Sequence, residues 1–274
     1  MILSPKKAVP KAITIAGSDS GAGAGIQADL KTFAALEVYA STIITAVTAQ
    51  NTLGVTAVHT LPAEMVTAQL DAVMEDIGAD AVKIGMLSEA GVIEAVAAGL
   101  VRHRLDKVVL DPVMMAKSGH RLLVEEAVAA LIHFLLPLAY VVTPNLPEAE
   151  VLAGIKIEGM KDRIKAAEII HKAGAKYVVI KGGHDRHQPQ DILFDGKVVR
   201  ELETSWVDTP NTHGTGCTFS SAIAAGLAKG LSVPEAVAQA KDYLTGALRC
   251  SYAVGAGHSP VNHFFRWWPE EGRA

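Results

Sequence analysis

The chain has 274 residues, of which half are hydrophobic, 20% are charged and two are cysteines, and its formal net charge is −4. This length and apolar content allow a large core, in one big α/β domain or in two small ones. The charge balance argues against a nucleic-acid surface, two cysteines do not make a disulfide framework, and no apolar run approaches the roughly 18 residues of a membrane span. We therefore expect a soluble, cytoplasmic protein without nucleic acid or membrane partners.

Short apolar or β-branched runs alternate along the chain with longer segments of helical spacing. In chain order, we predict strands at 12–16, 42–47, 55–60, 81–84, 107–110, 140–142, 177–180, 192–194 and 197–201. The intervening and following helices are predicted at 26–38, 62–77, 89–100, 125–136, 164–173, 216–229 and 234–251. This alternation indicates βαβ units, and so an α/β fold with a central, mainly parallel sheet and helices on both faces. Asp195-Gly196 predicts a hairpin between the last two strands, and no linker interrupts the single domain expected over 1–274.

Glycines, acids, an amide and a lysine follow the predicted strands. The segment GSDSGAGAG follows the first predicted strand. Later strands are followed by Asp111-Pro112, Thr143-Pro144-Asn145, Lys181-Gly182-Gly183 and finally NTHGTGC. Ligands bind beyond the carboxyl ends of strands in such sheets, so these groups should meet at one edge. The pattern predicts a phosphate-handling site with acids available for a metal.

The first glycine stretch does not match the dinucleotide-binding fingerprint, because Ile26 stands where the third glycine is needed. The chain also has no GxxxxGK[ST] loop, which excludes a Walker nucleotide site. Taken alone, the stretch fits equally well a loop that lets a helix pack close to the first strand.

The stretch THGTGCTFSSA is more informative. Gly214 and Gly216 let the backbone approach a ligand, and the helix that follows offers N–H groups and a positive dipole end. Such a turn stabilises charge on a phosphoryl group in transfer. Cys217 would lie in the first helical turn, where its pKa should fall; the alternative is a structural cysteine behind a capping turn.

Asp111 and Glu148 are the candidate metal ligands. Asp111 directly follows an apolar strand, and Asn145 and Glu148 are one helical turn apart at a helix start. Oxygen ligands of this kind suit Mg²⁺, usually through waters. Helix capping explains Asn145 and Glu148 equally well.

Taken together, the motifs carry a resemblance to a known family. They are, in order, GSDSGAGAGIQADLKTF, TAVTAQNTLGV, VKIGML, LDPVMMAKSG, VTPNLPEAE, KGGH, NTHGTGCTFSSA and SPVNHFFRWW. From about Ala12 to Trp268 the chain resembles the hydroxymethylpyrimidine and phosphomethylpyrimidine kinases of thiamine biosynthesis, in the ribokinase-like superfamily. The resemblance implies a three-layer fold, usually a homodimer. It also implies an enzyme that uses ATP and Mg²⁺ to phosphorylate 4-amino-5-hydroxymethyl-2-methylpyrimidine and then its monophosphate.

The resemblance also implies roles for particular residues. Gln50 lies where the family pairs a side chain with the ring nitrogen and amino group of the pyrimidine. The other positions implied are Ala24, Asp29, Met86 and Val113 for the substrate; Asn145, Lys181, Thr212, Gly214 and Gly216 for ATP; Asp111 and Glu148 for Mg²⁺; and Cys217 with Gly214, Gly216 and Lys181 for catalysis. The sequence departs from the family at residues 20–25, where SGAGAG replaces the common SSGGAG.

Two alternatives stay open. A pyridoxal or pyridoxine kinase has the same frame, but the polar Gln50 and the threonine of THGTGC favour an aminopyrimidine substrate. A non-catalytic protein that binds pyrimidine or nucleotide is the second, and the candidate residues at every strand end argue against it.

Overall fold

Nine strands form one sheet in the computed structural model, which describes residues 8–115, 125–183, 190–202 and 206–268. The strands are β1 (Lys11–Asp19), β2 (Tyr39–Gln50), β3 (Val55–Thr60), β4 (Ala81–Ile84), β5 (Val108–Leu110), β6 (Val141–Val142), β7 (Tyr177–Ile180), β8 (Asp191–Phe194) and β9 (Val199–Leu202). Their order across the sheet is β3-β2-β1-β4-β5-β6-β7-β8-β9. Strands β2, β1, β4, β5, β6 and β7 are parallel, whereas β3, β8 and β9 are added antiparallel at the two edges. The mainly parallel sheet and the hairpin at Asp195-Gly196 are therefore confirmed.

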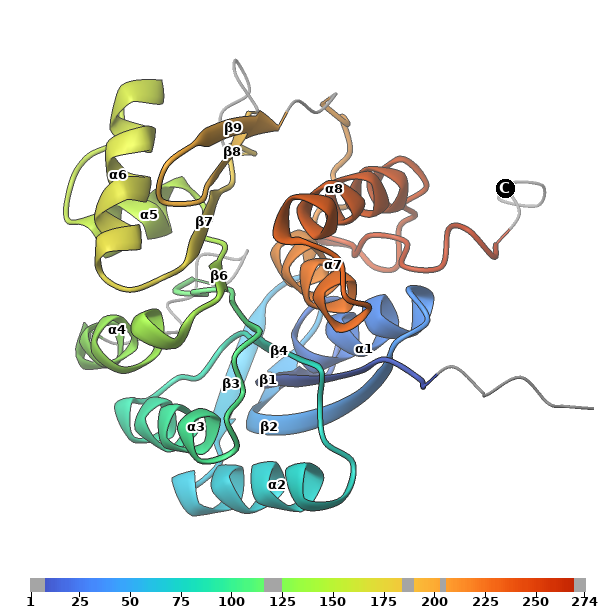
Figure 1. Cartoon of the computed structure of the whole chain (residues 1–274). Coiled ribbons are helices and arrows are strands. Elements are labelled where there is room, and N and C mark those ends of the chain that lie inside the picture. Colours follow the sequence, from blue (N-terminus) through green and yellow to red (C-terminus); the bar gives the residue numbers. More distant parts are fainter. Residues whose placement is uncertain (1–7, 116–124, 184–189, 203–205, 269–274) are drawn as a thin grey trace, which may run out of the picture.

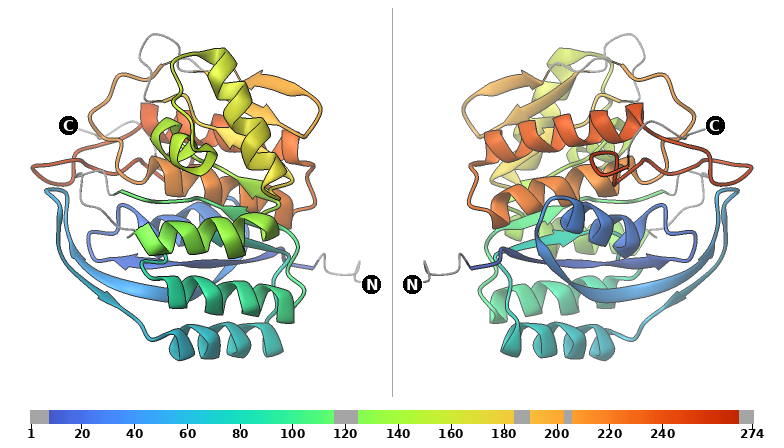
Figure 2. Two further views of the ribbon diagram at one scale, coloured as in Figure 1. Left: turned by 90° about the vertical axis from the view of Figure 1, so that its left-hand side faces the viewer. Right: turned by 90° about the vertical axis from the view of Figure 1, so that its right-hand side faces the viewer.

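Helices cover both faces of the sheet, as predicted (Figure 1). They are α1 (Gly25–Ala35), α2 (Ala63–Asp76), α3 (Ala90–Arg102), α4 (Glu125–Ala130), α5 (Leu146–Ala153), α6 (Met160–Lys172), α7 (Thr215–Ala228) and α8 (Val233–Arg249). Helices α2 to α6 lie on one face and α1, α7 and α8 on the other, as the two views of Figure 2 show. No helix in the described part of the chain is long and apolar enough to cross a membrane.

Two apolar cores result, one on each face, because successive strand residues point to opposite sides. Val82 and Ile84 of β4 belong to the core under α2 to α6, whereas Ala81 belongs to the core under α1, α7 and α8. Lys83 points to the same side as Ala81, where it meets Asp29 of α1. The alternation of β4 thus places one charged side chain inside the protein.

The first strand and the helix predicted at 125–136 differ from the prediction. Strand β1 continues beyond Gly17 because Ser18 and Asp19 pair with β2 past a register shift. The helix predicted at 125–136 is α-helical only to Ala130, and then continues as a π-helical turn and a 3₁₀ turn that contains Pro137. Proline lacks the N–H that a longer helix needs, so the regular helix ends before it.

Residues 255–263, here called the C-terminal segment, tie distant parts of the chain together. The N–H groups of Gly257 and His258 donate to Thr52 in the β2–β3 loop, at 3.3 and 2.8 Å. The carbonyl of Ser259 accepts from the N–H of His213 at 3.1 Å. His263 Nε2 lies 3.0 Å from Thr218 Oγ1 in the first turns of α7. The segment therefore joins the edge hairpin to the start of α7.

Candidate active site

A cavity of about 680 Å³ lies at the carboxyl edge of the sheet. All but one of the predicted site residues line it: Ala24, Gln50, Met86, Asp111, Val113, Asn145, Glu148, Lys181, Thr212, Gly214, Gly216 and Cys217. Trp206 and Leu244 line the same cavity, and the sequence analysis did not single them out. The last four residues of LDPVMMAKSG and His184 of KGGH lie outside the described residues. Residues spread over most of the chain thus meet in one place.

The glycine turn at the start of α7 forms one wall of the cavity. Gly214 is the N-cap residue of this helix and has a φ of +75°, a conformation that side chains disfavour. A Cβ atom at Gly214 would lie 1.9 Å from the carbonyl oxygen of Gly23, so only glycine lets the two loops touch. The N–H groups of Gly216 and Cys217, in the first turn of α7, have no acceptor within the helix. This wall can therefore bind an anion.

A lysine and two carboxylates lie next to that turn. Lys181 Nζ donates to Asp111 Oδ1 at 2.9 Å, and a Cβ at Gly216 would lie 3.4 Å from Asp111 Oδ2 and 3.5 Å from Lys181 Nζ. Burial alone would lower the pKa of Lys181, but the charges of Asp111 and Glu148 raise it above its ordinary value. The ammonium is therefore a permanent positive charge beside the anion-binding wall.

Glu148 closes a capping box at the start of α5. Its N–H donates to Asn145 Oδ1 at 2.9 Å, and its Oε2 accepts from the Asn145 N–H at 2.8 Å. The capping interpretation is thus correct, and both residues also line the cavity. Burial raises the pKa of Glu148 to about 7, with the nearby charge of Asp111 adding to it and that of Lys181 opposing it. Two carboxylates this close favour a cation between or beside them.

Cys217 faces the cavity from the first turn of α7, but its pKa does not fall as the sequence analysis expected. Burial raises the pKa of the thiol to about 11, and the positive charge of Lys83 opposes this rise. The expected effect of the helix dipole is thus outweighed by the loss of solvent. The thiol form dominates at neutral pH before any ligand binds.

Asp29 is the one predicted site residue that does not line the cavity. Its side chain is 0% exposed and accepts hydrogen bonds from Lys83 Nζ at 2.9 Å, Thr14 Oγ1 at 2.5 Å and Ser221 Oγ at 2.7 Å. Burial would lower the pKa of Lys83, but the carboxylate of Asp29 outweighs it and raises the pKa above its ordinary value. Asp29 therefore holds Lys83, and Lys83 is the member of the pair that reaches the cavity.

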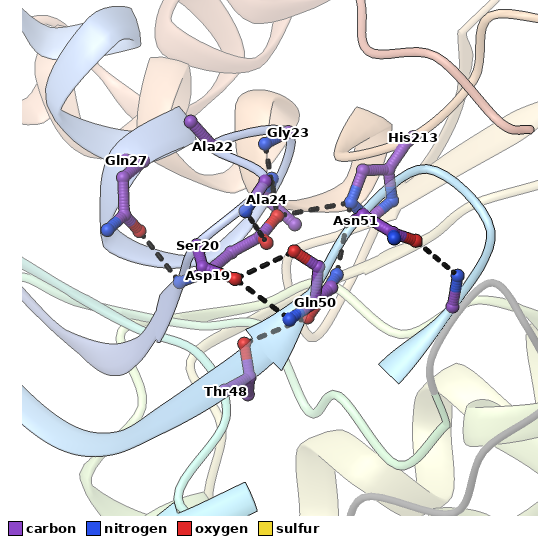
Figure 3. Close-up of polar contacts among 12 residues, drawn as sticks. Asp19, Ser20, Ala22, Gly23, Ala24, Gln27, Thr48, Gln50, Asn51 and His213 are labelled. Atoms are coloured by element: carbon purple, nitrogen blue, oxygen red, sulfur yellow. Dashed lines mark hydrogen bonds and ion pairs between the residues drawn. The ribbon is translucent and has the colours of Figure 1, made fainter. Parts of the chain in front are cut away.

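Asp19 organises the glycine loop between β1 and α1 (Figure 3). Its Oδ1 accepts from the N–H of Gly21 at 2.8 Å, and its Oδ2 accepts from those of Gly23 and Ala24 at 3.0 and 2.8 Å. His213 Nε2 lies 3.2 Å from the same Oδ2 and 3.2 Å from Gln50 Nε2. Burial alone would raise the pKa of Asp19, but the bonds from His213 and the backbone hold it below its ordinary value.

The departure from the SSGGAG pattern falls on a strained position. Ala22 has a φ of +58°, in the left-handed region that favours glycine. We expect Ala22→Gly to raise the free energy of unfolding by about 1 kcal/mol, because it relieves this strain. Denaturant unfolding of the purified variant measures the change.

Ala24 offers the matched control for that substitution. Its backbone is extended, with φ of −136° and ψ of −160°, so glycine relieves nothing there. Ala24→Gly should be neutral or destabilising by a few tenths of a kcal/mol to about 1 kcal/mol. Equal effects of the two substitutions would refute the assignment of strain to Ala22.

Known proteins with the same features are found by sequence and by structure. The sequence profile described as phosphomethylpyrimidine kinase matches residues 19–262. The hydroxymethylpyrimidine/phosphomethylpyrimidine kinase of Rhizobium meliloti is 54% identical over 263 residues, which cover 94% of this chain and 98% of the relative. The enzyme of the same name from Bacillus subtilis is 50% identical over 259 residues, which cover 93% of this chain and 94% of the relative. The chain belongs to the phosphomethylpyrimidine kinase family.

The chain is also similar to a solved structure of a kinase with a different substrate. The ADP complex of Bacillus subtilis pyridoxal kinase superposes with a TM-score of 0.87 at 43% identity, covering 93% of this chain and 98% of its own. The phosphomethylpyrimidine kinase family thus shares its ribokinase-like fold with kinases of another vitamin. Fold alone does not separate the two substrates, so the residues that contact the ring must do so.

Sequence reasoning also missed Asp19, Lys83 and His213, which the structure brings to the cavity. Each lies within a motif on which the phosphomethylpyrimidine kinase resemblance rests, namely GSDSG, VKIGML or NTHGTGC. Their partners are far away in the sequence, 194 residues for Asp19 and His213, so no local pattern reveals the contact.

Proposed function

We propose that this protein is an ATP-dependent kinase that phosphorylates the hydroxymethyl group of 4-amino-5-hydroxymethyl-2-methylpyrimidine and then its monophosphate. The observation that carries this proposal is one cavity that holds both halves of such a reaction. The anion-binding turn of α7, with Lys181 and Asp111, lines this cavity, and Gln50, Met86 and Val113 line it too. The family relationship gives the substrate class, and the ADP complex of the pyridoxal kinase relative supports a nucleotide in the same cavity.

The chain's own residues supply binding, charge stabilisation and proton removal. The N–H groups at the start of α7 and the ammonium of Lys181 would stabilise charge on the phosphoryl group in transfer. Asn145 and Thr212 would contribute to the ATP side of the cavity. Cys217 would first lose its own proton to water in the cavity, and the resulting thiolate, stabilised by the positive charge of Lys83, would accept the proton of the substrate hydroxyl.

The residues present fit a magnesium ion that arrives with the nucleotide. Among the described residues, no cluster of three or more His, Cys, Asp or Glu side chains could hold a metal by itself. Two carboxylates, Asp111 and Glu148, line the cavity instead, and Mg²⁺ is commonly held by one or two carboxylates together with phosphates and waters. When bound, the ion would neutralise charge on the phosphates.

Gln50 gives the most direct test of the substrate. We expect Gln50→Ala to raise KM for the pyrimidine about tenfold, because a hydrogen-bonded ring edge loses its partner, and to leave KM for ATP unchanged. Steady-state assays of ADP release measure both constants. An equal loss for both substrates would indicate a folding defect and refute the assigned role.

The same assay separates the two vitamin kinases. Wild-type protein should phosphorylate the aminopyrimidine with a higher kcat/KM than pyridoxal. Faster turnover of pyridoxal would make pyridoxal kinase the correct function. ADP release that depends on the pyrimidine also excludes a non-catalytic binding protein.

The homodimer and the cytoplasmic location stay proposals. Support for a dimer comes from the edge hairpin of β2 and β3, where Val47, Leu53 and Val58 are 47%, 69% and 40% exposed. Exposed apolar side chains on an edge hairpin are typical of a surface that another subunit covers. The low cysteine content supports a reducing compartment.

A further inference from the structure

One nitrogen of His213 lies next to a hydrogen-bond acceptor and next to a hydrogen-bond donor. His213 Nε2 lies 3.2 Å from Asp19 Oδ2 and 3.2 Å from the nitrogen end of the Gln50 amide (Figure 3). Asp19 is a carboxylate, since three backbone N–H groups donate to it, and a carboxylate only accepts. Nε2 must therefore carry a proton, whether the ring is neutral or charged.

A protonated Nε2 cannot face the NH₂ of Gln50, because both groups would be donors. The oxygen and nitrogen of a carboxamide exchange places when the group turns over, without any other movement of the side chain. The consistent arrangement has Oε1 of Gln50 at the position facing His213. Nε2–H of His213 then points between the Asp19 carboxylate and the Gln50 carbonyl.

The other end of the amide leads independently to the same arrangement. Thr48 Oγ1 lies 3.1 Å from the carbonyl oxygen of Ser18 and 3.1 Å from the amide atom of Gln50 that is placed as Oε1. A hydroxyl has one hydrogen, and the Ser18 carbonyl can only accept it. Thr48 Oγ1 therefore accepts from the amide, which requires the NH₂ of Gln50 at that end.

We propose that Asp19 and His213 form a positioning pair that fixes the polarity of the Gln50 amide, with its carbonyl toward His213 and its NH₂ toward Thr48, and thereby selects 4-aminopyrimidines over 4-oxopyrimidines. This deepens the proposed function and rests on Gln50 contacting the ring. The carbonyl has a second lone pair and the NH₂ a second hydrogen with which to meet the substrate. A 4-aminopyrimidine matches them with its amino group and ring N3, whereas a 4-oxopyrimidine offers an acceptor and an N3–H donor in the reverse order.

The fixed polarity also sets which way the ring points. The 4-amino group lies on the His213 side of the amide and N3 on the Thr48 side. The hydroxymethyl group is on C5, the ring atom beyond C4, so it lies on the His213 side too. His213 directly precedes the turn of Gly214 to Cys217, where the proposed phosphoryl transfer takes place. An amide of the opposite polarity would point the hydroxymethyl group away from that turn.

The pair is held rigidly enough to fix the amide. A Cβ at Gly23 would lie 2.2 Å from Cδ2 of the His213 ring, so the ring packs directly on the glycine loop. The N–H of His213 is bonded to Ser259 of the C-terminal segment, and Asp19 is 3% exposed. Neither partner has room to turn away from Gln50.

The test compares kcat/KM for the 4-amino substrate and for its 4-oxo analogue. Wild-type protein should prefer the 4-amino compound by at least about tenfold, the value of one well-placed hydrogen bond. His213→Phe removes the donor and frees the amide to turn, so this preference should fall about tenfold. His213→Gln keeps an N–H donor near the same place and should retain the wild-type preference.

Controls separate this role from a structural one. The same change at an exposed neighbouring histidine, His258→Phe, should leave the preference unchanged. A merely structural His213 would lower kcat/KM for both compounds equally, and an unchanged ratio in folded His213→Phe would overturn the proposal. If that variant does not fold, Thr48→Val frees the other end of the amide, and its preference must fall instead. Wild-type turnover of both compounds at equal rates would refute the pair but not the kinase, whereas turnover of neither would refute the proposed function.

Discussion

Cys217→Ala is expected to lower kcat about a hundredfold or more, the lower range for loss of a general base. ATP binding should change by less than about threefold, because the backbone N–H groups of the α7 turn remain in place. The thiol has a pKa of about 11 through burial, so it becomes a base only after its own proton has passed to water in the cavity and while a positive charge stabilises the thiolate. Lys83 supplies such a charge. Single-turnover kinetics and a nucleotide titration measure the two quantities.

Cys250 gives the matched control, since it terminates α8 and does not line the cavity. Cys250→Ala should keep kcat within about threefold of wild type. If Cys217→Ala does the same, the thiol only shapes the pocket, and the turn acts without it. Sequence alone did not distinguish these roles, and the two cysteine variants together do so.

Lys83→Met should lower the free energy of unfolding by about 3–5 kcal/mol, the usual cost of leaving a buried charge without its partner. Lys83 and Asp29 are both 0% exposed, and their charged atoms are 2.9 Å apart. Removal of the ammonium leaves the Asp29 carboxylate with only the hydroxyls of Thr14 and Ser221. Denaturant unfolding followed by circular dichroism measures the loss.

Two further variants make this test specific. Lys83→Met combined with Asp29→Asn removes both charges and keeps the polar contacts, and should recover at least half of the lost stability. Lys156→Met breaks an ion pair with Glu150 on the surface, where the lysine side chain is 85% exposed, and should cost less than about 1 kcal/mol. If Lys83→Met costs no more than Lys156→Met, the buried pair is not a stabilising element.

The order of elements could be read from the sequence because periodicity is a local property. Strands β3, β4 and β7 have the predicted bounds, since each is a short run that ends at a polar or turn residue. Strand β1 was predicted too short because its last residues, Ser18 and Asp19, are polar. Only the neighbouring strand β2, whose residues 47 and 48 pair with them, reveals that they are extended.

The candidate site could be predicted in outline for a related reason. Parallel strands bring their carboxyl ends to one edge, so residues after each strand meet there whatever the details of packing. The direction of Asp29 could not be predicted, because the resemblance gives only its neighbourhood; its side chain points into the protein toward Lys83. His213 was not singled out from the sequence, because its contacts with Asp19 and Gln50 exist only after folding.

The pKa of Cys217 could not be predicted from the sequence either. A position at a helix N-terminus predicts a lowered value, whereas the thiol in the folded chain has a raised one. Burial decides the sign, and burial depends on the side chains of α1, β4 and α7 together.

The C-terminal segment has a consequence for when the enzyme becomes competent. His213 is held through Ser259, Thr218 in the first turns of α7 contacts His263, and the loop at Thr52 is bonded to Gly257 and His258. These contacts come from residues made late in synthesis, after every strand of the sheet has left the ribosome's catalytic centre. A growing chain can therefore build the sheet and both cores first, but the walls around the substrate are fixed only when residues 255–263 have been added. Until then a new molecule has a folded sheet and folded cores but a substrate site whose walls are not yet held in place.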